Sequence, residues 1–359
     1  MLPNLAAVFG LALSFATATS QARSGAPAPI DAKPLALAAG ATNGVAVSDA
    51  KPWHIKISYT LNTPDGKPVS QGTFEEFWAG PSRYKRIFAS PAFNQVEFGT
   101  ADGPRRTGTP DSPPADLQAV ADEFLRPVPL DAASIEAAKL QAQPLTLGST
   151  KLVCITAATP ATPTQPASST SYCVDENPPV LRLTVTNGGI TKTTRSNLVK
   201  FQDRYVAQKV DRYTTLPPMP GPKPPVPPPP PSPELSAKVE TLELLSAVDE
   251  AMFTPPAGAV APPKIIALDE KTTKKQLLQH PMAEYPMMAH YAHVGGVVVV
   301  ALRVRTDGHV SDLRVMSGPP MLQQAAKDAI SKWTYKPFVV QDQPVEVETT
   351  ASTTFNLMP

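Results

Sequence analysis

The sequence predicts an α+β protein of two domains. The first is a curved antiparallel sheet with a helical insertion, and the second is a three-stranded antiparallel sheet packed against one helix. Two observations support this class. Apolar and polar residues alternate in many short segments from Trp53 onward, which is the period of half-buried strands. Near the C-terminus, an apolar stripe at helical spacing separates an apolar hairpin from a regularly alternating strand at residues 345–357.

The N-terminal domain is predicted to consist of short strands interrupted by helices. Ile55, Ile57 and Tyr59 alternate with polar residues, and further strands are expected at 69–78, 84–88, 95–98, 151–156, 171–175, 180–186, 190–200 and 204–213. Residues 112–141 follow a helical spacing interrupted by prolines, which predicts one or two short helices there, with Leu140 in the second. These elements predict a curved sheet around a helix. Its inward apolar side chains form either a closed core or a cavity for an apolar ligand.

Two cysteines flank a segment with the composition of a loop. Cys154 and Cys173 each lie in a short apolar run, and the residues between them are rich in Ala, Thr, Pro and Ser. Two strands joined by this loop would bring the sulfurs together. We therefore predict a disulfide, which for a loop of this size stabilises by about 3 kcal/mol. Two buried free thiols are the alternative.

Proline accounts for 44 of the 359 residues, and much of it gathers in a tract at 216–233. Such a tract forms an extended rod. It is either a spacer between the domains or a loop extruded from a hairpin, because residues 238–245 alternate like a strand that could pair with 204–213, although they also fit a helical stripe. We favour the hairpin. The expected order is then a flexible leader at 23–50, the N-terminal domain at 51–256 with the tract as an insertion, a linker at 257–275 and the C-terminal domain at 276–359.

Residues 1–22 have the features of an export signal. An apolar run at 5–16 is too short to span a bilayer, and Ser20 and Ala22 supply the small residues that signal peptidase requires. The region before this run carries no Lys or Arg, so an uncleaved inner-membrane anchor is the alternative. Cleavage predicts a soluble periplasmic protein, and the anchored alternative faces the same compartment.

The C-terminal module has a clear strand order. Residues 297–304 are apolar on both faces, as expected of a central strand, and a turn at 306–309 leads to a returning strand at 310–316. A helix with its apolar stripe follows. The last strand has one apolar face, and its polar face carries Glu346, Glu348, Thr350, Ser352, Thr354 and Asn356. The predicted sheet order is 2-1-3, with the last strand as an open edge.

These elements and their motifs resemble the C-terminal domain of the TonB energy-transducer family. The residues that carry the resemblance are Tyr285, Pro286, Gly296, Asp307, Gly308, Trp333 and Pro337. The resemblance implies a domain without catalytic chemistry that binds the short, extended TonB box of an outer-membrane receptor. The peptide adds to the edge of the last strand, so the polar-face residues named above are the expected partner-binding set.

Two features depart from that family. Met282-Ala283-Glu284 stands where the family has Gln-Pro, and we find no uncleaved transmembrane helix of the kind that engages a proton-driven motor. The resemblance therefore supports peptide binding more directly than energy-coupled transport. The N-terminal domain is similar in outline to LolA/LolB-type periplasmic half-barrels, which implies the alternative function of a lipid or apolar-ligand carrier.

Other function classes find little support in the sequence. The net charge of +1 gives no overall attraction to nucleic acid. No catalytic serine elbow, zinc-protease motif or phosphate-binding glycine loop occurs. His290 and His293 have helical spacing, but no Cys or carboxylate cluster accompanies them. We therefore expect neither an enzyme nor a bound cofactor or metal.

Overall fold

The computed structural model describes residues 30–46, 50–63, 66–160, 167–186, 191–214 and 232–356. The predicted export signal at 1–22, part of the predicted leader, nearly all of the polyproline tract and Leu357 lie outside this part of the chain. Strands predominate, and the two sheets predicted from the sequence are both present.

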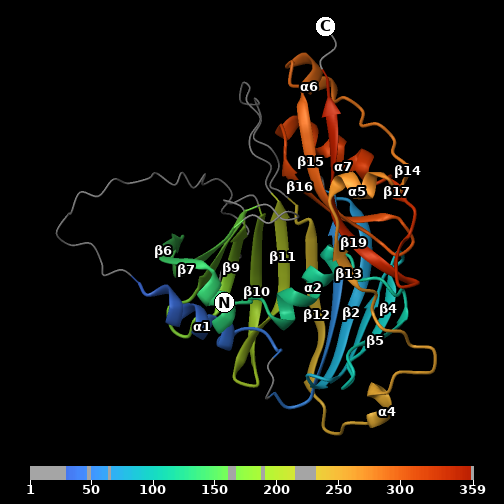
Figure 1. Cartoon of the computed structure of the whole chain (residues 1–359). Helices are drawn as coiled ribbons and strands as arrows, with labels where there is room; N and C mark the ends of the chain where they lie inside the picture. The colour runs from blue at the N-terminus through green and yellow to red at the C-terminus, as the bar shows by residue number, and fades with distance from the viewer. Residues whose placement is uncertain are drawn as a thin grey trace, which may run out of the picture.

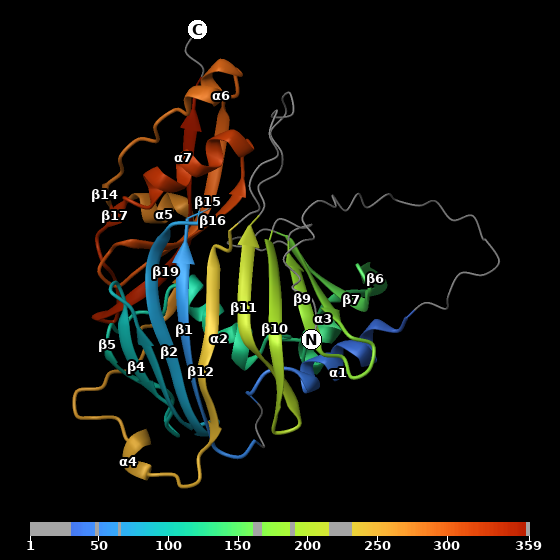
Figure 2. The same cartoon turned by 180° about the vertical axis from the view of Figure 1, so that it is seen from behind.

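The N-terminal domain is built on one twelve-stranded antiparallel sheet, in the order β5-β4-β3-β2-β1-β12-β11-β10-β9-β8-β7-β6. The sheet is curved, with helices along its inner face (Figures 1 and 2). Its strands are β1 (Trp53–Asn62), β2 (Pro68–Gly80), β3 (Arg83–Ala89), β4 (Asn94–Phe98), β5 (Arg105–Gly108), β6 (Lys139–Leu147), β7 (Thr150–Thr159), β8 (Ser168–Val174), β9 (Leu181–Thr186), β10 (Thr191–Phe201), β11 (Arg204–Thr214) and β12 (Leu235–Leu244). Its helices are α1 (Ala32–Thr42), α2 (Ala115–Leu125), α3 (Ala132–Ala137) and α4 (Glu250–Phe253).

Helix α2 packs on the inner face of the strands around β1. Val120 and Phe124 of α2 belong to one buried cluster with Trp53, Ile55 and Phe74 of the facing strands. Each of these side chains is at most 1% exposed, and burial of a large apolar side chain contributes about 1.5–3 kcal/mol. The inward apolar side chains of β1 and the apolar stripe of α2 therefore pack together in a single core.

Two sequence expectations in this domain are wrong. Leu140 lies in β6 rather than in a helix. Residues 32–42, expected to be flexible, form α1. The carbonyl groups of Gly40, in its last turn, and of Gly44, just after its C-cap, accept hydrogen bonds from Arg204, both at 2.8 Å. The guanidinium group satisfies the carbonyls that a helix end leaves without partners. Because that partner is about 160 residues away, the alanine-rich sequence alone gives little sign of the helix.

Two cross-strand pairings tie this sheet together. Cys154 and Cys173 face each other across β7 and β8 and form the predicted disulfide. Strands β11 and β12 are antiparallel neighbours, with Lys209 opposite Lys238. The chain between them, where the polyproline tract lies, therefore connects two adjacent strands of one sheet.

The C-terminal domain contains the predicted 2-1-3 sheet together with strands that the sequence did not predict. Its main sheet has the order β13-β19-β15-β16, and β18 also pairs with β19. The strands are β13 (Ile265–Ala267), β14 (Leu277–Gln279), β15 (Gly296–Val304), β16 (Val310–Ser317), β17 (Thr334–Tyr335), β18 (Phe338–Val340) and β19 (Gln343–Phe355), and the helices are α5 (Glu270–Lys274), α6 (Met287–Tyr291) and α7 (Pro320–Ile330). Helix α7 packs on β15, β16 and β19, and Leu322, Ala326 and Ile330 are fully buried.

The segment expected to be a linker lies against both domains. Val260 forms a two-way backbone bridge with Arg106 of β5, at 2.7 and 2.9 Å. Further along, β13 pairs in parallel with β19, and α5 also contacts β19. Residues 257–275 therefore run from one sheet to the other.

Candidate functional site

The family-motif residues hold the C-terminal fold together. The Tyr285 hydroxyl donates a hydrogen bond to the Val294 carbonyl at 2.8 Å, and its ring packs edge-on against Phe355. Trp333 is 7% exposed, and its indole N–H donates to the carbonyl of Pro281. Pro286 is the N-cap of α6, and Pro337 lies between β17 and β18.

The two motif glycines have positive φ angles, which favour glycine over other residues. Gly308 has φ +85°, and a Cβ at this position would lie 2.0 Å from the carbonyl oxygen of Tyr335. Asp307 accepts a hydrogen bond from the backbone N–H of His309 in the same turn. Gly296, at the start of β15, has φ +143°. These residues stabilise the turn after β15 and the start of that strand.

The backbone of β19 shows which groups face outward from the sheet. Antiparallel pairing with β15 runs from Gly296–Phe355 to Val304–Val347. The N–H groups of Glu346 and Ser352 bond on the other side, to Lys264 and Glu270. Because backbone groups alternate in direction along a strand, Glu348, Thr350 and Thr354 share this outward direction. The residues predicted as the partner-binding set are thus those whose backbone groups lie at the outer edge.

That edge is partly occupied by the chain itself, contrary to the expectation of an open strand. Ile265, Ile266 and Ala267 of β13 lie opposite Glu346, Val347 and Glu348. Further along, a carboxylate oxygen of Glu270 accepts hydrogen bonds from the Ser352 N–H at 2.9 Å and the Ser352 hydroxyl at 2.6 Å. Thr354 and Asn356 are exposed beyond these contacts, at the end of β19 near α6 and the C-terminus (Figure 1).

The side chains of the polar face are less solvated than the sequence predicted. Glu346 is fully buried, and its carboxylate accepts hydrogen bonds from the Ser112 N–H at 3.0 Å and the Ser112 hydroxyl at 2.6 Å. Glu348 is half-buried and contacts Arg303 at 3.1 Å. Glu346 therefore does not lie on an open polar face as expected, because Ser112 of the N-terminal domain covers it.

Other carboxylates join the two domains beside this strand. Asp111, which is 2% exposed, accepts hydrogen bonds from the Thr306 N–H at 3.0 Å and its hydroxyl at 2.7 Å, and forms an ion pair with Arg305 at 3.1 Å. Asp312 accepts a hydrogen bond from the N–H of Ala115 at 2.7 Å. No local pattern predicts these contacts, since each joins residues nearly 200 positions apart.

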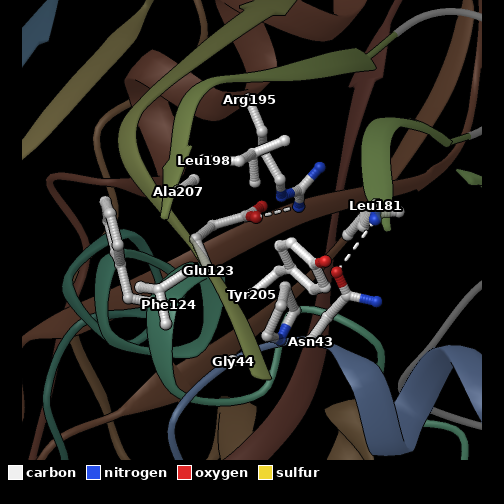
Figure 3. A pocket seen from close by; sticks show the side chains of 11 residues that line it. Asn43, Gly44, Glu123, Phe124, Leu181, Arg195, Leu198, Tyr205 and Ala207 are labelled. Atoms are coloured by element: carbon white, nitrogen blue, oxygen red, sulfur yellow. Dashed lines mark hydrogen bonds and ion pairs between the residues drawn. The ribbon is translucent and has the colours of Figure 1, made fainter. Parts of the chain in front are cut away.

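The inner face of the large sheet holds an ion pair beside a small cavity. Arg195 of β10 and Glu123 of α2 bond directly beside Tyr205, and Asn43 accepts a hydrogen bond from the Leu181 N–H at 2.8 Å (Figure 3). The cavity that these residues line has a volume of about 10 Å³. That space is on the scale of one water molecule. An acyl chain does not fit it in this arrangement.

The two histidines with helical spacing do not lie on one helix. His290 lies in α6, whereas His293 follows it with φ +51°. Within the ranges that the structure describes, no group of three or more His, Cys, Asp or Glu side chains is placed to hold a metal ion. None of the helices described has both the length and the apolar character needed to cross a membrane.

Comparisons with known proteins give one family match, in the C-terminal domain. Residues 281–357 match the family described as Gram-negative bacterial TonB protein C-terminal. No curated protein sequence matches the chain.

Solved structures match both parts of the chain. The TonB C-terminal domain of Pseudomonas aeruginosa has 24% identity and a TM-score of 0.21, and the match covers 23% of this chain and 87% of that one. A LolA superfamily protein from Nitrosomonas europaea has 8% identity and a TM-score of 0.39, covering 63% of this chain and 98% of that one. A putative outer membrane lipoprotein-sorting protein domain from Vibrio parahaemolyticus has 7% identity and a TM-score of 0.35, covering 56% and 89%. The resemblance predicted from the motifs is confirmed for residues 281–357, which match the TonB C-terminal family.

Proposed function

We propose that this chain is a periplasmic cell-envelope protein whose C-terminal domain binds an extended peptide of an outer-membrane partner by strand addition along β19. TonB C-terminal domains interact with outer-membrane receptors, and residues 281–357 match that family. The observation that carries the proposal is the edge of β19. It already accepts a parallel strand, β13, from elsewhere in the chain.

The opposite edge of the sheet is less suited to strand addition. Asp312 of β16 has φ +56°, and the β15–β16 register shifts twice. Such irregularities bend a strand and disrupt the ladder that an added peptide would need. Asp312 is also engaged by the N-terminal domain through Ala115. Strand β19 instead pairs with β15 over nine consecutive residue pairs without a shift.

The test removes single outward N–H groups from β19 in the full-length protein. Thr350→Pro and Thr354→Pro each delete a donor that faces away from β15, and Thr350→Ala and Thr354→Ala keep it. We expect each proline variant to weaken binding of a fluorescein-labelled, TonB-box-like peptide about tenfold, measured by anisotropy, and the alanine variants to bind within about twofold of wild type. Equal affinity of all folded variants would rule out strand addition at this edge.

The position of the mature N-terminus completes the proposal. Export with cleavage after residue 22 gives a protein free in the periplasm, whereas retention of residues 1–22 gives the anchored arrangement in which the TonB family transmits energy. Mass spectrometry of the natively expressed protein distinguishes the two. The carrier alternative has weaker support, because α2 side chains occupy the inner face of the central strands of the large sheet in the described structure.

A further inference from the structure

The edge of β19 is covered by one continuous piece of the same chain, residues 264–274, which we call the cover segment. The Glu346 N–H donates to the Lys264 carbonyl at 2.9 Å, and the Leu268 N–H donates to the Glu348 carbonyl at 3.0 Å. In a parallel ladder the bonded residues alternate, so Ile266, between Lys264 and Leu268, also directs its backbone groups toward β19.

The cover segment makes the kinds of contact that an added peptide would make. Ile266 and Leu268 pack against the core of the C-terminal domain, and their alternation places both on the side of α7. The Glu270 carboxylate caps the outward N–H of Ser352 and is itself held by Lys274 at 2.9 Å. Backbone pairing with alternate side chains in apolar sites is the general mode of strand addition.

The pairing of the cover segment with β19 is also short, so that another strand can displace it. Strand β13 is three residues long, and Ile265 is 47% exposed. Parallel pairing is slightly less stable per residue than antiparallel pairing. The cover segment is not part of a hairpin with β19, because its neighbour in the sheet lies about 80 residues further along the chain.

We propose that the cover segment is a built-in competitor that occupies the β19 edge in cis and must leave before a partner peptide can pair there. The proposal rests on the proposed function of that edge. A site that is open for only a fraction of the time binds its ligand with an affinity reduced by that fraction. Weakening the cover therefore raises the apparent affinity of β19 for any added strand.

The experiment compares two neighbouring proline substitutions in the full-length protein. Ile266→Pro removes an N–H that faces β19, and Ile265→Pro, the matched control, removes one that faces away. We expect Ile266→Pro to bind the labelled TonB-box-like peptide about tenfold more tightly than wild type, and Ile265→Pro to bind it within about twofold of wild type. A melting curve confirms that each variant is folded. If Ile266→Pro is not folded, Glu270→Ala, which removes the cap on Ser352, takes its place.

A second probe separates failure of the competitor from failure of the proposed function. It is a labelled peptide with the sequence of residues 262–270, which carries the chain's own strand. If this peptide binds Ile266→Pro more tightly than wild type while the TonB-box-like peptide binds neither, the cover is a competitor and the proposed partner is wrong. If neither peptide gains affinity in folded Ile266→Pro or Glu270→Ala, the competitor proposal is overturned.

Discussion

Replacing Glu346 should weaken the contact between the two domains, although its position in the sequence suggests an exposed charge. The side chain is fully buried and accepts hydrogen bonds from the N–H and the hydroxyl of Ser112. Hydrogen bonds to a charged group are worth about 1.5–3 kcal/mol each. Glu346→Ala also removes the desolvation cost of the carboxylate, which offsets part of that loss. We therefore expect a net destabilisation of about 2–4 kcal/mol.

A double-mutant cycle with Ser112→Ala isolates the contact. Ser112→Ala removes the hydroxyl donor and keeps the backbone donor, so the coupling free energy between the two sites should be about 1.5 kcal/mol. Urea denaturation followed by circular dichroism and tryptophan emission measures it, provided that both signals change in one transition. Glu348→Ala is the control on the same strand. It should cost less than about 1 kcal/mol, because Arg303 retains Asp312 as a partner at 3.2 Å. A coupling free energy near zero would refute the assignment of Glu346 to the domain interface.

Four further predictions address stability. Trp333→Ala should destabilise the C-terminal domain by about 3–5 kcal/mol, because the ring is almost fully buried, and a wild-type melting temperature would contradict this packing. Gly308→Ala should cost at least about 1–3 kcal/mol, through its positive φ and the clash of the new Cβ with a backbone carbonyl, and unchanged urea unfolding would contradict it. Cys154→Ser should cost about 3 kcal/mol, and two titratable thiols in unreduced wild-type protein would argue against the bridge. Burial alone would raise the pKa of the Glu270 carboxyl group, but its hydrogen bonds hold this pKa below its ordinary value of 4.5. The wild-type protein should therefore melt at a higher temperature than Glu270→Gln at neutral pH, and this difference should shrink as the pH falls below about 4.5.

The sequence predicts well where one local period decides the structure. The alternation of β19 fixes which residues lie on its covered face, and Val345, Val347 and Ala351 are all buried there. The two cysteines flank a loop, and their strands pair in register. In each case the signal lies within a few residues of the element that it predicts.

The sequence predicts poorly where the partner is distant. Strand β13 is only Ile-Ile-Ala and follows two prolines, so it has no period to recognise, and its stability comes from β19. The alternation of the last strand places Glu346 on the polar face, which predicts a solvated side chain. The sequence does not reveal that Ser112 lies against it. The residues of β19 therefore predict the candidate edge, whereas the residues of the cover segment do not predict that it pairs there.

The domain interface also explains why α2 begins where it does. Its N-cap is Pro114, which offers no side-chain hydrogen bond, yet the N–H of Ala115 is satisfied by Asp312 of the C-terminal domain. A carboxylate at a helix N-terminus typically contributes about 1 kcal/mol, so separating the domains would weaken the helix that packs on the central strands of the large sheet. Asp312 is in turn bonded to Arg303, which is bonded to Glu348 on β19. A continuous series of one hydrogen bond and two ion pairs thus joins the helix in the N-terminal core to the strand on which peptide binding is proposed.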